Sequence, residues 1–225
     1  MLSKSLLQFL RDLKENNYKE WFHENKPRYQ KVKKEFEQFV AHTIADIAQF
    51  DNSVKHLEPK HCIFRINRDI RFSNDKSPYK TNFGGFIVPG GKNAGYAGYY
   101  IHIEPGNCFL AGGIYMPPPD RLKAVRNEIF ENTADFKKIL SDKNFKKHFS
   151  EISSENKLKT APKGFPKDFK DIDLLRHKHY TVLKYIDEEL VTSDKFVDKV
   201  RETFMALYPF NSFINEAINY QLSID

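Results

Sequence analysis

The chain has 225 residues, with 36 Lys and Arg against 30 Asp and Glu, a formal net charge of +6 and a pI near 9.1. This length is enough to build a substantial hydrophobic core within one domain. No run approaches the roughly 20 apolar residues that span a bilayer. The N-terminal stretch also lacks the small-residue cleavage site of a secretory signal. We therefore expect a cytoplasmic protein with no membrane partner.

The two cysteines, Cys62 and Cys108, lie in apolar runs and do not form a metal-spaced pair. We interpret them as buried free thiols rather than as a disulfide, because buried free cysteine behaves as a small apolar residue. Free thiols are typical of a reducing compartment, which agrees with a cytoplasmic location.

The first fifty residues carry helical patterns. Ser3 is a good N-cap for a helix that ends near Asn16, because leucines recur behind it at helical spacing. Asn25, with Pro27 in the first turn, opens a second and longer helix that runs to about Phe50. A linker, residues 51–60, follows.

Beyond the linker the pattern changes to that of strands. Nine of the ten glycines fall between Gly84 and Gly113, and such clustering indicates antiparallel strands joined by tight connections. A further strand is expected at Cys62–Ile66. The strands of the meander are expected at Phe83–Pro89, Tyr96–Glu104 and Cys108–Tyr115.

The prolines at positions 117–119 end this region, and helical patterns follow to about residue 149. One more strand is expected at Tyr180–Ile186, then a helix through Phe196–Tyr208 and a separate last helix at Phe213–Leu222. The sequence thus predicts an α+β fold, an antiparallel β-sheet meander packed against several α-helices. We expect one domain over residues 1–225, with N-terminal helices at about 3–50, the sheet core at about 61–116, and C-terminal helices plus one added strand at about 119–222.

The segment from Arg65 to Lys80 concentrates charge. It holds five cations and two carboxylates, a local net charge of +3 that is half of the charge of the whole chain. Apolar residues separate the charges, which is not the pattern of a disordered basic tail. The charged residues are Arg65, Arg68, Arg71, Lys76 and Lys80, against Asp69 and Asp75.

We interpret this segment as an anion-binding site, because arginine holds phosphate or carboxylate oxygens in pairs. In this interpretation Tyr79 stacks on the ligand or donates a hydrogen bond to it, and Asp69 orients an arginine. The predicted ligand-binding residues are Arg65, Arg68, Asp69, Arg71, Asp75, Lys76, Tyr79 and Lys80.

The alternative is an internal network of ion pairs that fixes a turn, with Asp69 on Arg65 or Arg71 and Asp75 on Lys76 or Lys80. Two carboxylates cannot neutralise five cations. The network would therefore need acids from elsewhere, such as Glu104 or Asp120.

A second group of polar residues follows from alternation along the strand Tyr96–Glu104. Tyr100, His102 and Glu104 share one face of that strand. If this face lies beside the charged segment, His102 is a candidate general acid or base, with Glu104 setting its tautomer. The alternative is a half-solvated sheet face of ordinary polar residues.

Three further features of the sequence concern possible ligand or metal sites. Gly112 and Gly113 inside a strand pattern indicate a close approach, of a ligand or of a packed helix, and helix packing is favoured. The glycine order G-x-G-x-x-G and the P-loop order are both absent, which argues against those nucleotide-binding modes. His177 and His179 would share a strand face, but they lack a third ligand nearby, so we assign them a surface or core role and predict no metal site. The sequence specifies no cofactor.

Three blocks of sequence carry a family likeness. They are FRINRDIRFSNDKSPYKT, GYYIHIEPGNCFLAGGIYMPPPDRLKAVR and APKGFPKDFKDIDLLRHKHY, in this order. Together they resemble the bacterial and fungal family called domain of unknown function 2461, from about Leu6 to Ile218. The resemblance supports one domain and implies no activity, cofactor or catalytic residue.

Two functional hypotheses follow. The first is binding of a small phosphorylated or other anionic ligand through residues 65–80, with hydrolysis or group transfer at His102 and Glu104. The basic pI also permits nucleic acid, although a charge of +6 falls short of the continuous basic stripe of such proteins. The second is a non-catalytic protein-interaction module that docks acidic partners. The oligomeric state is left open.

Overall fold

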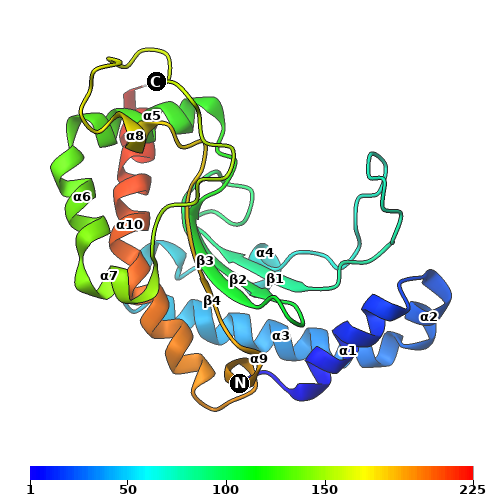
Figure 1. Cartoon of the computed structure of the whole chain (residues 1–225). Coiled ribbons are helices and arrows are strands. Elements are labelled where there is room, and N and C mark those ends of the chain that lie inside the picture. The colour runs from blue at the N-terminus through cyan, green and yellow to red at the C-terminus, as the bar shows by residue number, and fades with distance from the viewer. Residues whose placement is uncertain (225) are drawn as a thin grey trace.

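A computed structural model describes residues 1–224 (Figure 1). The strands are β1 (Phe83–Ile87), β2 (Gly98–Ile103), β3 (Phe109–Ile114) and β4 (Tyr180–Tyr185). The helices are α1 (Lys4–Glu15), α2 (Lys19–Glu24), α3 (Lys26–Ile47), α4 (Pro59–Cys62), α5 (Pro119–Glu131), α6 (Thr133–Ser141), α7 (Lys143–His148), α8 (Ile172–Leu175), α9 (Glu188–Val191) and α10 (Phe196–Ile224), with a 3-10 turn at Asn52–Val54.

The four strands form one antiparallel sheet in the order β1-β2-β3-β4. The first three follow one another as a meander, and β4 joins the edge of β3 after the helices α5 to α8. This arrangement confirms the predicted α+β class and the antiparallel meander. It also confirms the added strand near the C-terminal end.

One face of the sheet forms part of the hydrophobic core. Tyr99, Ile101 and Ile103 of β2 are fully buried on this face, where α3 packs on β1 and α10 on β3. A methyl group built on Gly112 would overlap the side chain of Leu207 in α10. The close approach predicted at this glycine is therefore helix packing, as the sequence favoured.

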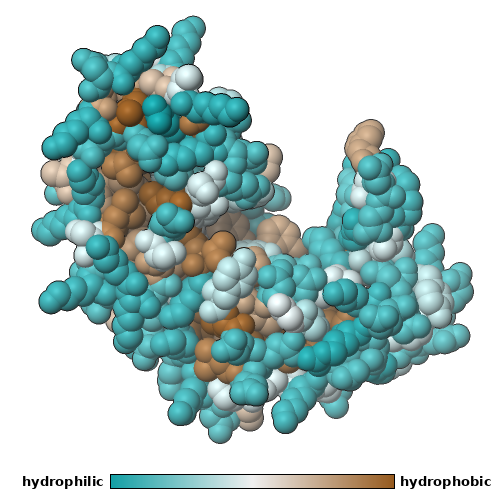
Figure 2. Space-filling view, viewed as in Figure 1, coloured by the Kyte–Doolittle hydropathy of each residue, from teal (hydrophilic) through white to brown (hydrophobic). Residues whose placement is uncertain are grey.

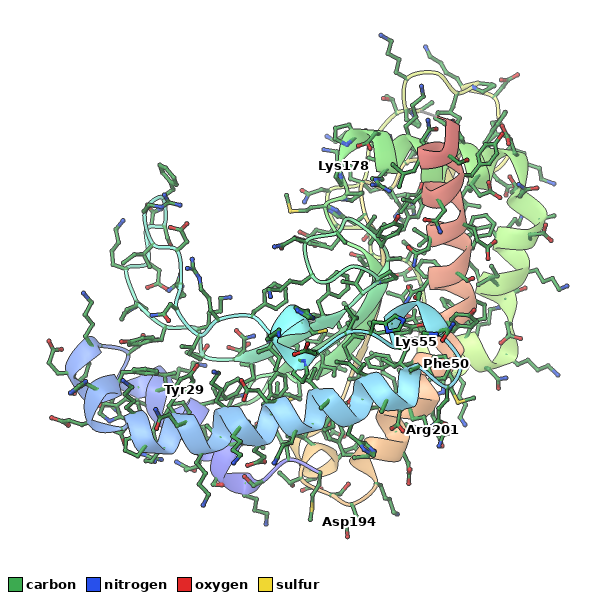
Figure 3. All side chains as sticks on the ribbon, turned by 180° about the vertical axis from the view of Figure 1, so that it is seen from behind. Tyr29, Phe50, Lys55, Lys178, Asp194 and Arg201 are labelled. Atoms are coloured by element: carbon green, nitrogen blue, oxygen red, sulfur yellow. The ribbon has the colours of Figure 1, made fainter. Side chains whose placement is uncertain are left out.

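The helices leave the other face of the sheet open. In Figure 1, α1 to α3 form one side of the molecule and α5 to α7 with α10 form another, with the sheet in the angle between them. Figure 3 shows α3 from behind, with Tyr29 in its first turn and Phe50 just beyond its C-terminal end. The two helical groups lie on the same side of the sheet, where α3 and α10 contact each other.

The charged segment, residues 65–80, projects from the sheet as an arm (Figures 1 and 2). Isolated bridges hold its two legs together, Asn67 with Tyr79 and, at the base, Ile63 with Gly85. The ring of Tyr79 stacks on Phe22 at 3.9 Å between centroids. At the far end of the arm, Phe72 is 96% exposed.

Two sequence predictions of local structure were wrong. Cys62–Ile66 is not a strand, because Pro59 in the first turn and a Glu58–His61 capping box begin the short helix α4, which ends at Cys62. The last two helices are one helix, α10, with Pro209 in its interior. Burial of Leu207 and Phe210 on either side of the proline compensates for the roughly 3 kcal/mol that an interior proline costs.

Over residues 1–224, none of the helices combines the length and the apolar character needed to traverse a lipid bilayer.

Candidate functional site

The open face of the sheet forms the floor of a cavity of about 640 Å³. The register places side chains in rows across the strands: Gly84, His102, Phe109 and Tyr185 in one row, and Phe86, Tyr100, Ala111 and Leu183 in the next. A third row, Gly98, Gly113 and Thr181, is nearly without side chains. Figure 2 shows the hollow that separates the arm from the body of the molecule. The residues that line the cavity include Phe64, Lys80, Asn82, Phe86, Lys92, Tyr100, His102, Phe109, Ala111, Gly113, Tyr115, Ser153, Glu155 and Thr181.

Two of the five cations of the arm are paired within it. Arg71 Nη2 lies 2.7 Å from Asp69 Oδ2, and Arg68 forms an ion pair with Asp75. Hydrogen bonds from Ser77, together with the Arg68 contact, hold the pKa of Asp75 at about 2. Part of the arm thus contains internal ion pairs, as in the alternative interpretation, although Asp75 pairs with Arg68 rather than with a lysine.

The remaining three cations have different positions. Lys76 Nζ donates to the carbonyl oxygen of Ile70, 3.0 Å away, within the arm. Among the described residues, neither Arg65 nor Lys80 forms an ion pair with a carboxylate. Lys80 is the one residue of the five that lines the cavity. Of the three cations without a carboxylate partner within residues 1–224, Arg65 and Lys80 are therefore at the base of the arm and Lys76 is within it.

The Lys80 ammonium lies 5.3 Å from the centroid of the Phe64 ring. Burial, and then the positive charge of nearby Arg65, lower the pKa of Lys80. Both causes disfavour the charged form, so an anion bound beside Lys80 would relieve an existing electrostatic cost. This end of the cavity is therefore suited to a negative group.

A chain of hydrogen bonds runs through His102. Its Nδ1 lies 3.0 Å from the Tyr100 hydroxyl and 3.4 Å from Asn82 Nδ2, and its Nε2 lies 3.2 Å from Glu104 Oε2. The imidazole stacks on Phe109 at 4.5 Å between centroids. Tyr100 and Asn82 line the cavity beside His102, whereas Glu104 is not part of its lining.

The protonation of this chain follows from the pKa directions. Burial lowers the pKa of His102 in spite of the neighbouring Glu104, so the imidazole is neutral at neutral pH. An ionised carboxylate only accepts, and therefore Nε2 carries the hydrogen and donates to Glu104. The lone pair of the imidazole is on Nδ1, where it accepts from the Tyr100 hydroxyl, whose pKa burial raises to about 12.

Glu104 is fixed by its own donors. Burial raises its pKa, but hydrogen bonds from Thr81, Asn107 and His102 together outweigh this and lower the pKa. The Thr81 hydroxyl donates to Oε1 at 2.7 Å, and Thr81 follows Lys80 directly in the sequence. The same short stretch therefore places the cation in the cavity and holds the carboxylate that orients His102.

Other predicted residues lie apart from the cavity. Tyr79 does not line it and instead packs on Phe22, with its backbone N–H donating to Asn17. His177 and His179 are both 5% exposed, and His179 Nδ1 accepts from the backbone N–H of Met116. Within residues 1–224 there is no cluster of three or more His, Cys, Asp or Glu side chains placed to hold a metal ion.

The sequence analysis did not single out four residues of the site. Phe64 directly precedes the arm, Asn82 lies two residues after it, and Phe109 lies across the strand pair from His102. Their positions along the chain gave no reason to select them. Tyr100 was placed on the correct face by strand alternation but was given no role. Because alternation places Tyr100 and His102 on the same face of one strand, their hydrogen bond could have been suggested from the sequence.

Comparison with known proteins gives one match. A family model described as conserved hypothetical protein, domain of unknown function 2461, matches residues 5–213. No curated protein matches the chain, and no solved structure does.

Proposed function

This chain belongs to the conserved hypothetical protein family called domain of unknown function 2461, and since membership assigns no activity, we propose a function from the cavity itself. We propose that the open face of the sheet binds a phosphorylated or other anionic ligand beside Lys80. We further propose that His102 carries out acid–base chemistry on it, in a hydrolysis or a group transfer.

The observation that carries this proposal is that Lys80 and His102 line the same cavity. Lys80 supplies a positive charge without a carboxylate partner, next to the second unpaired cation, Arg65. His102 supplies a neutral imidazole whose lone pair is on the side of the cavity-lining Tyr100 and Asn82. A cation for binding and a base for proton transfer are the minimum that such a reaction requires.

The aromatic and apolar walls make these two groups more effective. Phe64 lies under the Lys80 ammonium and Phe109 lies against the imidazole. A wall of this kind excludes water when a ligand is bound, and charge–charge attraction rises as the local dielectric constant falls. The volume of about 640 Å³ lies within the range of small-molecule sites.

Binding is tested by calorimetric titration with inorganic phosphate and ribose 5-phosphate at two salt concentrations. We expect the variant Lys80→Met to bind at least tenfold more weakly than the parent. The matched control is Lys33→Met, an exposed lysine of α3 that pairs with Glu37. Equal binding by parent and Lys80→Met, or no binding to the parent, would contradict the proposal.

Chemistry is tested separately with a panel of phosphate esters, by measuring the release of inorganic phosphate. We expect His102→Gln to keep its affinity for anions and to lose about 10²–10⁴-fold in rate, the usual contribution of a positioned acid or base. An unchanged rate in this variant would remove His102 from the reaction and leave a binding protein.

A second candidate function is favoured by the arm itself. Phe72 is 96% exposed at its end, and the Arg71 guanidinium lies 5.9 Å from the centroid of that ring. An exposed aromatic residue with an arginine beside it is typical of a protein contact. This is the alternative of a non-catalytic module that docks an acidic partner. It predicts that a photo-crosslinker at position 72 captures one protein, and that the variant Lys80→Met, which changes only the anion site, captures it equally well.

We also propose that the protein works in a reducing compartment, the cytoplasm. Cys62 and Cys108 are both free and buried, and burial raises the pKa of each thiol to about 11. Such thiols are structural and inert rather than reactive.

A further inference from the structure

The cavity is asymmetric along the strands. The row that contains His102 and Phe109 is bulky, and the next row combines the rings of Phe86 and Tyr100 with the small Ala111. The third row offers Gly113 and Thr181, with almost no side-chain volume. The floor therefore has a flat shelf of small residues bordered by aromatic rings.

Three aromatic rings of the cavity are arranged edge to face, and one of them, Tyr100, is the neighbour of Ala111 across the strand pair. Tyr100 makes interplanar angles of 70° with both Phe64 and Phe86, at centroid distances of 6.3 and 6.4 Å. All three rings line the cavity and are only partly buried. A flat unsaturated ring placed on the shelf would have aromatic partners at its edges and a smooth floor beneath it.

Charge differs between the two ends of the cavity. Lys80 lies at the end next to the arm, while Ser153 and Glu155 line the side next to β4, where the Ser153 N–H donates to the Thr181 carbonyl oxygen. Lys92 also lines the cavity, but its ammonium is directed to the carbonyl oxygens of Lys60 and His61. One end thus suits an anion and the other suits hydrogen-bond donors.

We infer that the ligand of this cavity is a free nucleotide, with its phosphate on Lys80 and its base on the shelf formed by Ala111, Gly113 and Thr181. This rests on the proposed function and names the ligand class. Alternate residues of a strand lie about 7 Å apart, so Ala111 is one row, and Gly113 and Thr181 are two rows, beyond the row of His102 and Phe109. Glu155 and Ser153 then accept from, or donate to, the polar edge of the base.

The glycine-rich loops that usually cradle phosphates are absent from the chain. Recognition here depends instead on contacts with aromatic rings at the edges of the base and on one side-chain cation. Such edge contacts tolerate different bases, because every base is a flat aromatic ring. The negative charge of Glu155 at the far side of the cavity would repel a phosphate backbone that continued across the sheet. This repulsion favours a free nucleotide over a single strand of nucleic acid.

The test compares ligands that contain one or both parts. AMP, GMP, CMP and UMP are titrated separately into the full chain by calorimetry, beside ribose 5-phosphate, adenosine and a twelve-nucleotide oligo(A). We expect at least one nucleotide to bind ten times more tightly than ribose 5-phosphate, and adenosine to bind more weakly than AMP. If ribose 5-phosphate binds and no nucleotide binds more tightly, the inference is overturned while the anion site of the proposed function stands.

The decisive variant is Ala111→Leu, which fills the shelf and leaves Lys80 and His102 unchanged. We expect it to lose at least tenfold in nucleotide affinity and to keep its affinity for ribose 5-phosphate. The control is Tyr185→Leu, because Tyr185 is on the same open face, 68% exposed, and outside the cavity. Equal losses in both variants would overturn the inference, as would oligo(A) binding ten times more tightly than AMP. Circular dichroism of each variant establishes that it is folded.

Discussion

The residues on the two faces of the four-stranded sheet have different roles. On the covered face, Tyr99, Ile101 and Ile103 have no exposed surface and are packed by α3 and α10. On the open face, Tyr100 and His102 are partly exposed and form a hydrogen-bonded chain at a cavity. Adjacent residues of β2 thus serve stability on one side and the candidate chemistry on the other, because successive side chains of a strand point in opposite directions.

This difference predicts unequal effects on stability, and the largest is expected in the core. Ile101→Ala should lower the free energy of unfolding by about 2–5 kcal/mol, because it removes buried methyl groups and leaves a void. Leu183→Ala on the open face, where the leucine is 39% exposed, should cost about 1 kcal/mol or less. Urea denaturation measures both. Equal costs would mean that the open face is as tightly packed as the core.

The adjacent tyrosines of β2 give a matched pair. The Tyr99 hydroxyl donates to the buried Asp51 at 2.8 Å, so Tyr99→Phe should cost about 1–3 kcal/mol by leaving a buried carboxylate oxygen without this donor. Tyr100→Phe should cost less, because His102 Nδ1 keeps Asn82 as a second donor. In thermal denaturation, a larger loss for Tyr100→Phe than for Tyr99→Phe would reverse the assignment of the two faces.

A pH dependence distinguishes two histidines. Burial, and then the positive charge of Lys184, lower the pKa of His148 from 6.5 to about 4. The unfolded chain therefore takes up a proton that the folded chain excludes, so stability should fall as the pH drops from about 6.5 to about 4. His148→Gln should make the unfolding free energy less dependent on pH in this window, measured by urea titrations across it. The exposed His56→Gln is the control, and an unchanged slope in His148→Gln would contradict the prediction.

His102 on the open face should respond to its surroundings in the same direction. Burial lowers its pKa, so the pKa in Phe109→Leu, which opens one side of the imidazole, should move up toward the ordinary value. The shift is followed by NMR titration of the imidazole resonances. A pKa that falls further in this variant would show that burial by Phe109 is not the cause.

The smallest effect on stability is expected at the end of the arm. Phe72→Ser should change the free energy of unfolding by no more than about 0.5 kcal/mol, because the ring is almost fully exposed. The measurement is the midpoint of urea denaturation, with Tyr79→Ser as the comparison, since Tyr79 stacks on Phe22 and should be costly to remove. A large loss in Phe72→Ser would mean that the arm packs on something in the folded state.

Much of the local structure was predictable because it follows from short-range patterns. Ser3 caps α1 through its side chain as expected, and the glycine-rich region forms the three strands of the meander. The errors arose where tertiary packing outweighs local preference, as at Pro209 within α10. The roles of the candidate site residues stay predictions. His102 and Lys80 do share a cavity, but the sequence could not assign Asp75 to Arg68 or show that Tyr79 contacts Phe22.

The sequence by itself determined most of the elements, the alternation that separates Tyr99 from Tyr100, and the surplus of positive charge between positions 65 and 80. Those properties depend on residues that are close along the chain. Only the tertiary structure decided which cations keep their charge unpaired and which face of the sheet stays open. The open face depends on contacts between distant segments, such as Gly112 with Leu207. The pairing of the cations depends on how the arm folds back on itself, which brings Asp75 to Arg68.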